Sequence, residues 1–429
     1  MHFDNTIEFA KALDAADPLR AFRNKFIIPK NDDGREKIYF LGNSLGLQPI
    51  SASGEITKVL GEWAQKGVES FFEGDQPWMS LHDQLTPAMA QVVGALPEEI
   101  VIMNQLTVNL HLMLASFYRP QGIRRKILCE AGAFPSDQYM LRTHLQTFGL
   151  DPDSELIEVP ADAHTQLINE EKLINTIYEL ADQLALVLVG GVNYYTGQVL
   201  PMQRITQAAH AVGAKAGFDL AHAAGNTALH LHDWKVDFAC WCNYKYLNCG
   251  PGAVATVYIH QRYHNDDSIP RLGGWWGQNK QRRFLMEKEF DPIRTAEGWQ
   301  VSTPSIPMYA LCKASLEIFE QAGIERLIDK SRLMSAYMHF LLNDLNHRHP
   351  GSLNILTPAD PQQHGAQVSI YMLRDGRKIF DDLTRSGIFC DWREPNVIRV
   401  APVPLYNTFE EIWSFCRTLS LLHDKGAIS

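Results

Sequence analysis

Five short runs of apolar residues in the middle of the chain restrict its possible folds strongly. Each run is continuous, without alternation of apolar and polar residues, which is typical of strands buried on both faces of a sheet. Stretches with the helical spacing of apolar residues separate the runs. This order predicts an α/β fold, a mostly parallel sheet flanked by helices. The runs comprise residues 126–129, 184–189, 214–219, 237–243 and 254–259.

A helix is predicted ahead of these runs as well. Ile56, Leu60 and Trp63 recur at the spacing that places three side chains on one face of a helix. Together with the five runs, this helix belongs to a large α/β domain that we expect to cover residues 50–310.

The last third of the chain has a different pattern. Two predicted helices lead into three short strands and a final helix, where Thr408 and Glu411 form the signature of a capping box. We expect a smaller α+β domain over residues 311–429, with a small mixed sheet, and an N-terminal segment, 1–49, that packs on it. The predicted helices and strands are 307–322, 325–345, 352–356, 367–373 and 397–400.

Charge and composition exclude several classes of function. The chain has 39 basic and 49 acidic residues, a net charge of −10, and no run of Lys or Arg, so we expect no nucleic acid and no membrane among its partners. The longest apolar stretch, 184–189, is too short to span a bilayer. The seven cysteines are scattered, which indicates reduced thiols in a cytoplasmic protein and no metal site.

Two residues at the ends of predicted strands indicate cofactor chemistry. Asp219 ends the run 214–219, at the sheet edge where α/β folds bind ligands. Lys245 follows the next run, about one strand–helix–strand step later, and precedes a Gly-Pro-Gly turn. A carboxylate for a pyridinium nitrogen and a lysine for an aldehyde are the pair that a pyridoxal 5'-phosphate (PLP) enzyme needs. Each residue alone has a simpler explanation, a helix cap for Asp219 and a surface lysine for Lys245.

Three further segments contain residue types suited to the same chemistry. Thr107 lies at a predicted helix start, where backbone N–H groups and a hydroxyl bind phosphate. Phe134, just before another helix, is placed to stack on a flat ring, and Asp137 would add negative potential near the ring nitrogen. Arg399, on a predicted strand, suits a carboxylate. The alternatives are ordinary helix caps with a core Phe and, for Arg399, a salt bridge within the small domain.

Taken together, the motifs resemble those of kynureninase, a fold-type-I PLP hydrolase related to the aminotransferases. The resemblance runs in order over nearly the whole chain, and the FLGNSLG, FDLAHA and Tyr-Lys segments are its most specific parts. It implies a large PLP-binding domain with a mostly parallel sheet, a smaller C-terminal domain, and a homodimer with shared active sites. The matching segments are 40–46, 105–107, 134–137, 194–198, 217–223, 243–248, 274–277 and 399–402.

The resemblance implies a role for each matching site residue. Lys245 is the implied Schiff-base lysine, Asp219 the partner of the pyridine nitrogen, and Tyr244 a catalytic proton donor or acceptor that also holds the phosphate. The other implied cofactor contacts are Leu106, Thr107, Phe134, Asp137, His222, Thr303 and, across a dimer interface, Trp275. The implied substrate contacts are Ser44, Thr303 and Arg399, with Arg399 on the α-carboxylate.

The implied reaction is the hydrolysis of L-kynurenine, or of 3-hydroxy-L-kynurenine, to anthranilate, or 3-hydroxyanthranilate, and L-alanine in tryptophan catabolism. Two alternatives stay open: another fold-type-I enzyme, such as an aminotransferase or a cysteine desulfurase, and an inactive relative that serves as a binding protein. The chain departs from the family pattern at Phe71-Phe72, in a stretch where many relatives have a His, and at Gly190, where relatives often have Ser or Thr. The first departure concerns recognition of the aryl ring, and the second concerns one cofactor contact.

Overall fold

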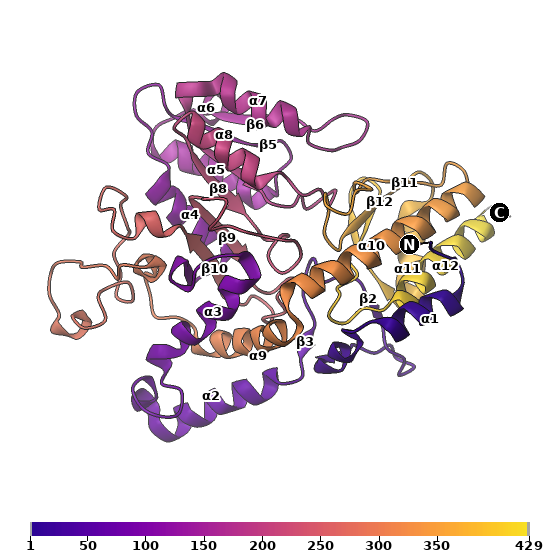
Figure 1. The fold of residues 1–429 in the computed structure, drawn as a ribbon, viewed down its shortest axis with the longest axis horizontal. Helices are drawn as coiled ribbons and strands as arrows, with labels where there is room; N and C mark the ends of the chain where they lie inside the picture. The colour runs from indigo at the N-terminus through magenta and orange to yellow at the C-terminus, as the bar shows by residue number, and fades with distance from the viewer. Residues whose placement is uncertain (1, 427–429) are drawn as a thin grey trace.

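A seven-stranded sheet forms the centre of the larger domain in the computed structural model, which describes residues 2–426 (Figure 1). Its strand order is β4-β10-β9-β8-β7-β5-β6; the strands from β9 to β6 are parallel, and β10 is antiparallel to β4 and β9. Five of these strands, β5 and β7 to β10, are the five apolar runs, which confirms the predicted sheet. The strands span Ile100–Ile102 (β4), Lys126–Glu130 (β5), Leu156–Val159 (β6), Leu184–Gly190 (β7), Lys215–Asp219 (β8), Phe238–Cys242 (β9) and Ala255–Ile259 (β10).

Helices cover both faces of this sheet because successive residues of each strand point to opposite faces. In β5, Ile127 and Cys129 belong to one core, and Leu128 between them belongs to the other. The first core contains α4 (Leu106–Phe117) and α5 (Pro135–Thr147). The second contains α3 (Leu81–Val93), α7 (Glu170–Leu180), α8 (Met202–Ala211) and α9 (Ile306–Ala322), and a short α6 (Pro152–Glu155) precedes β6.

Helix α2 (Ala52–Lys66) packs on α9 but leaves much of its apolar surface uncovered. Leu60 and Trp63 are 50% and 64% exposed. Their spacing predicts the helix correctly, yet the face that they share is not buried in this chain.

The smaller domain contains a four-stranded sheet in the order β11-β12-β15-β14, and every neighbouring pair is antiparallel. The prediction of a mixed sheet was therefore wrong. The fourth strand of the sheet, β14, was not predicted, because it has a single apolar residue, Trp392, and so gave no strand signal. The strands span Leu353–Ile355 (β11), Val368–Met372 (β12), Asp391–Arg393 (β14) and Val397–Val400 (β15), and the helices span Ile324–Arg348 (α10), Gly376–Arg385 (α11) and Phe409–Gly426 (α12).

The N-terminal segment contacts both domains. Helix α1 (Ile7–Ala16) lies against α12 (Figure 1), and β2 (Ile38–Tyr39) pairs in parallel with β13 (Ile388–Phe389) of the smaller domain. Leu47 belongs to the core of the larger domain. The remaining short strands are Phe26–Ile27 (β1) and Gln48–Pro49 (β3), which pair with each other.

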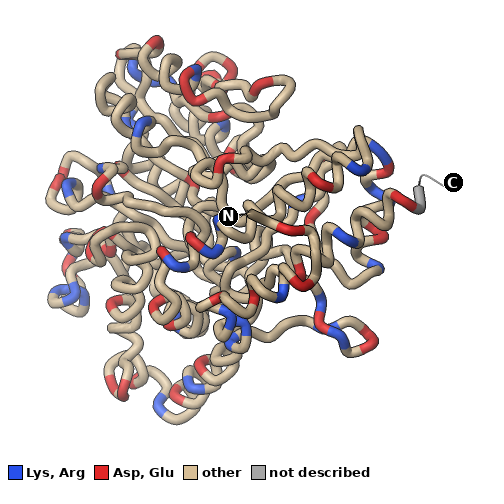
Figure 2. Tube along the Cα trace, turned by 45° about the vertical axis from the view of Figure 1, so that its right-hand side comes forward, with Lys and Arg blue, Asp and Glu red and all other residues tan. Residues whose placement is uncertain are grey.

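Acidic and basic residues are interspersed along the helices and loops of both domains (Figure 2). All seven cysteines are buried free thiols. Within residues 2–426, every helix is too short or too polar to cross a bilayer.

Candidate active site

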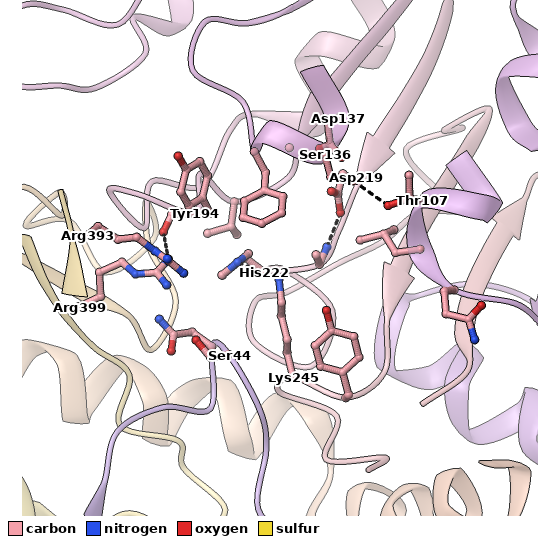
Figure 3. Close-up of a pocket in the computed structure, with 18 of the residues that line it drawn as sticks. Ser44, Thr107, Ser136, Asp137, Tyr194, Asp219, His222, Lys245, Arg393 and Arg399 are labelled. Carbon is pink, nitrogen blue, oxygen red and sulfur yellow. Dashed lines mark hydrogen bonds between the residues drawn. The ribbon is translucent and has the colours of Figure 1, made fainter. Parts of the chain in front are cut away.

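A cavity of about 420 Å³ lies at the carboxyl ends of the parallel strands (Figure 3). Its wall combines residues that follow β7, β8 and β9 with the first turns of α4 and α5, and the smaller domain contributes β14 and β15. This is the sheet edge where ligands bind in α/β folds. Ten predicted site residues line the cavity: Ser44, Leu106, Thr107, Phe134, Asp137, Asp219, His222, Tyr244, Lys245 and Arg399.

Lys245 lies in the tight turn after β9, and its amine points into the cavity (Figure 3). Its Nζ is 3.0 Å from Nε2 of His222. Burial lowers the pKa of His222 well below its usual value, and the charge of Lys245 lowers it further. A neutral His222 accepts from the amine through Nε2 and carries its proton on Nδ1. That buried Nδ1 has no hydrogen-bond partner among residues 2–426, so it is a donor available to a bound group.

Asp219 ends β8, and its Cα is in register with that of Gly190 on β7. Its Oδ1 accepts from the Ala221 N–H at 2.8 Å. The residues that follow form turns and not a helix, so the interpretation of Asp219 as a helix cap was wrong. The expected strand–helix–strand step to Lys245 was wrong for the same reason, although β8 and β9 are parallel neighbours and bring both residues to one edge.

Two more carboxyl groups line the cavity with Asp219. Asp137 lies in the first turn of α5, and Glu130, which the sequence analysis missed, ends β5. Burial raises the pKa of Asp137 well above its usual value, and the charge of Asp219 raises it further. Burial also raises the pKa of Glu130 to about 7. Three acids close together in one cavity favour a cationic ligand group, such as a protonated ring nitrogen.

Glu130 also accounts for the departure at Gly190. The Gly190 N–H lies 3.0 and 3.2 Å from the two carboxylate oxygens of Glu130, which accept from it. A Cβ at position 190 would lie 2.9 Å from one of these oxygens, so a Ser or Thr there would need the carboxylate to move. An acid directly after an apolar run, the same signal that identified Asp219, could have identified Glu130.

The first turns of α4 and α5 meet at another part of the cavity. Helix α4 begins at Leu106 with Gln105 as its N-cap, and its first N–H groups have no acceptor within the helix. Thr107 therefore lies inside the first turn and is not the cap. Its Oγ1 is 2.8 Å from Oγ of Ser136 (Figure 3). Two hydroxyl groups beside unpaired helix N–H groups suit a phosphate.

Arg399 on β15 faces the cavity from the smaller domain and is only 1% exposed. Its Nη1 donates to the carbonyl oxygen of Tyr194 at 2.6 Å, and its Nη2 forms an ion pair with Asp391 on β14. Burial lowers the pKa of Arg399 to about 10, which still leaves the group charged at neutral pH. Arg399 thus lines the cavity, as a carboxylate-binding residue would. It also forms a salt bridge within the smaller domain, which was the alternative interpretation of this residue.

The segment 40–46 brings Asn43 and Ser44 into the cavity wall because it packs on the turn that holds Lys245. The Gly46 N–H donates to the backbone of that turn at 2.8 Å, and a Cβ at position 46 would lie 2.3 Å from the carbonyl oxygen of Lys245. Only glycine allows this approach. Besides Glu130, the lining residues that the sequence analysis missed are Asn43, Gln105, Ser136, Val192, Tyr194, Ala221 and Arg393.

Two predicted site residues lie outside the cavity. Trp275, in the long loop between β10 and α9, is 41% exposed, and Thr303, just before α9, is also exposed. Phe71, at the other departure from the family pattern, packs edge-on against Trp78, with ring centroids 5.1 Å apart. The chain's own cavity therefore contains none of these three side chains.

The cavity fits PLP group by group. The first turns of α4 and α5 suit its phosphate, Asp219 suits its ring nitrogen, and Lys245 suits its aldehyde. The ring of Phe134 lies with its centroid 6.0 Å from the Lys245 Nζ, at the position for a stacking partner. The donor on the buried His222 Nδ1 supplies a partner for an acceptor on the bound group.

Known proteins are similar in sequence to this chain over nearly its full length. A family model described as the kynureninase C-terminal domain matches residues 327–419. The kynureninase of Flavobacterium psychrophilum is 48% identical over 98% of both chains, and that of Christiangramia forsetii is 46% identical over 100% of both. The similarity therefore covers both domains and the cavity between them.

Solved structures share the fold at lower identity. A mutant of C-DES, with glycine covalently linked to its PLP cofactor, has a TM-score of 0.77 and 22% identity, covering 92% of this chain and 98% of that one. The apo cysteine desulfurase of Thermococcus onnurineus has a TM-score of 0.73 and 17% identity, covering 91% and 95%. These likenesses confirm the predicted fold class, and at such identities they carry no more than the fold.

Proposed function

The chain belongs to the kynureninase family, and from this premise we propose that it is a PLP-dependent hydrolase that converts L-kynurenine to anthranilate and L-alanine. The observation that carries the proposal is the convergence of Lys245, Asp219 and Arg399 on one cavity. These side chains supply partners for an aldehyde, a ring nitrogen and an α-carboxylate. A relative retained only as a binding protein would not need this set.

The residues around Lys245 divide the proton chemistry among them. PLP, when bound, supplies the electron sink for the pair released as the substrate Cβ–Cγ bond breaks. Asp219 holds positive charge on the ring nitrogen, and the Lys245 amine, oriented by His222, takes the α-proton. Burial raises the pKa of Tyr244, so its hydroxyl keeps its proton and acts as a donor.

The hydrolysis balances with one water. Its oxygen adds to the γ-carbonyl carbon and ends in the carboxylate of anthranilate, and Cβ takes a proton and becomes the methyl group of alanine. Arg399 holds the α-carboxylate, which fixes the orientation of the bonds at Cα during these steps. Ser44 lines the same part of the cavity and completes the substrate site.

The cysteines argue against a desulfurase. A desulfurase uses an exposed, reactive thiol, because the thiolate is the nucleophile. All seven cysteines here are buried, and burial raises the pKa of Cys390 to about 12. Free buried thiols also agree with a reducing compartment, and we place the enzyme in the cytoplasm.

We propose that the enzyme is a homodimer that shares its active sites. A group of exposed aromatic side chains supports this: Phe284 lies 5.6 Å from Trp275 and 5.9 Å from Phe72 between ring centroids. Trp275 and Thr303 would then complete the cavity of the partner subunit. Other exposed apolar residues lie on α2, on the segment just after it, and in the loop between β10 and α9: Leu60, Trp63, Val68, Leu272, Leu285 and Met286.

The proposal is tested by product analysis of the PLP-loaded protein with L-kynurenine and 3-hydroxy-L-kynurenine. We expect equimolar anthranilate and alanine from L-kynurenine. Pyruvate or an amino-group product in place of alanine would indicate another fold-type-I reaction. The ratio of kcat/KM shows which of the two substrates the enzyme prefers. A preference for 3-hydroxy-L-kynurenine would support a role in nicotinamide synthesis, and a preference for L-kynurenine would support a role in tryptophan breakdown.

A further inference from the structure

Asp391 is the centre of a polar cluster on the smaller-domain side of the cavity. Its Oδ2 forms ion pairs with Nη2 of Arg399 and, at 3.1 Å, with Nη2 of Arg393, and it accepts from Oγ of Ser44 at 3.2 Å. A single carboxylate oxygen therefore holds two arginines and one hydroxyl. Asp391 and Arg399 are partners in the register of β14 and β15, so the backbone fixes their approach.

The two arginines share a second feature. Both line the cavity, and they lie next to each other in it (Figure 3). The Nε atoms of Arg393 and Arg399 are both buried, and neither has a hydrogen-bond partner within residues 2–426. A buried guanidinium N–H without an acceptor is costly, so two such donors at one site favour a ligand that supplies acceptors.

The net charge of this cluster favours the binding of one more carboxylate. Two guanidinium groups and one carboxylate leave one positive charge in the cluster, because burial keeps the neighbouring His222 neutral. The side chain of Asp391 is only 13% exposed, so water does not fully screen these charges. A planar carboxylate with two acceptor oxygens matches the unused donors of two guanidinium forks.

We propose that Arg393 is a second ligand of the substrate α-carboxylate beside Arg399, and that Asp391 is the positioning residue that holds both forks. This inference rests on the proposed function, since it takes the substrate to be an α-amino acid. Arg393 contributes binding energy for the carboxylate. Asp391 contributes orientation, because without it neither guanidinium group has an anchor on that side.

The first test compares substrates with and without the carboxylate. Arg393→Gln is assayed in the PLP-loaded enzyme with L-kynurenine and with its α-carboxamide, and Arg385→Gln, an exposed arginine on α11, is the matched control. We expect kcat/KM for L-kynurenine to fall roughly 10- to 100-fold, as loss of a charged hydrogen bond implies. The carboxamide, which lacks the charge, should lose much less. Equal losses for both substrates, or no loss for L-kynurenine, would overturn the role of Arg393.

The second test separates positioning from stability. Asp391→Asn keeps both arginine charges, so we expect KM for L-kynurenine to change little while kcat falls, with the melting temperature recorded on the same preparation. A lower melting temperature with unchanged kcat and KM would assign Asp391 a structural role and overturn the proposal for it.

A third measurement distinguishes failure of this inference from failure of the proposed function. If the wild-type enzyme does not hydrolyse L-kynurenine, the proposed function fails. The subsite is then tested by titrating the PLP-loaded protein with L-alanine and L-alaninamide and following visible absorbance. Weaker binding of L-alanine alone by Arg393→Gln supports the carboxylate subsite, and unchanged binding overturns it.

Discussion

Lys245 is the residue on which the proposed chemistry depends most. It supplies an amine within 3.0 Å of a neutral His222 in the cavity. We predict that Lys245→Ala abolishes anthranilate formation, measured by product fluorescence, because no other lining residue offers an amine. Lys11→Ala, an exposed lysine on α1, is the control and should keep wild-type turnover. Turnover close to wild type in Lys245→Ala would refute the assignment.

Glu130 gives a pH dependence that the sequence did not predict. Burial raises its pKa from 4.5 to about 7, so the folded protein binds this proton more tightly than the unfolded chain does. The stabilising contribution is full below 4.5 and is lost as the pH rises through 7. We therefore predict that Glu130→Gln gains thermal stability relative to the wild-type apoprotein between about pH 5 and about pH 8.

The measurement for Glu130 is the melting temperature of both apoproteins across this pH range. Glu73→Gln, which changes an exposed carboxyl group, is the control and should show no such trend. A constant difference between Glu130→Gln and wild type at every pH would mean that Glu130 does not titrate as its burial implies.

At the scale of elements, the pattern of apolar residues predicted those strands whose two faces are both covered by other parts of this chain. The five runs became strands because each is covered on both faces. The strand β14 was missed because two of its three residues, Asp391 and Arg393, are charged and form an ion pair, and only Trp392 packs on the core of the smaller domain. Likewise Ser136, Tyr194 and Arg393 became visible as site residues only when the fold brought them together, since no local spacing relates them.

The sequence pattern places the boundary between the two domains at residues 310 and 311, and this boundary stays a prediction. Helix α9 spans it, and the buried side chains of α9 belong to the core of the larger domain. Gly323 separates α9 from α10, whose buried residues from Met334 onward belong to the smaller core. We propose Gly323 as the better division between the domains.

The start of α12 offers a prediction about a single element. Thr408 Oγ1 accepts from the Glu411 N–H at 3.1 Å, and the Glu411 carboxylate accepts from the Thr408 N–H at 3.2 Å, so the predicted capping box is confirmed. We predict that Thr408→Ala lowers the free energy of unfolding by about 1 kcal/mol, measured in urea. Thr418→Ala, within the same helix, removes a hydroxyl that caps nothing and should cost less. Equal costs would show that the cap adds no stability.

At the scale of the whole molecule, the exposed aromatic side chains and the position of Trp275 and Thr303 outside the cavity both support the proposed homodimer. Phe284 is 52% exposed and touches both Phe72 and Trp275. We predict a wild-type mass in light scattering of two 48.5 kDa chains, and dissociation with loss of activity in Phe284→Glu. Ile123→Glu, at a comparably exposed site before β5, should remain dimeric and active.

A mixing experiment then tests whether the sites are shared. Lys245→Ala and Trp275→Ala are each expected to be defective alone. In a hybrid dimer, one site would combine the intact Lys245 of one chain with the intact Trp275 of the other, and random reassortment should restore about a quarter of wild-type activity. If Trp275 instead served its own chain, every site in the hybrid would lack one of the two residues. Mixing would then restore nothing, so the recovered activity measures directly whether Trp275 acts across the interface.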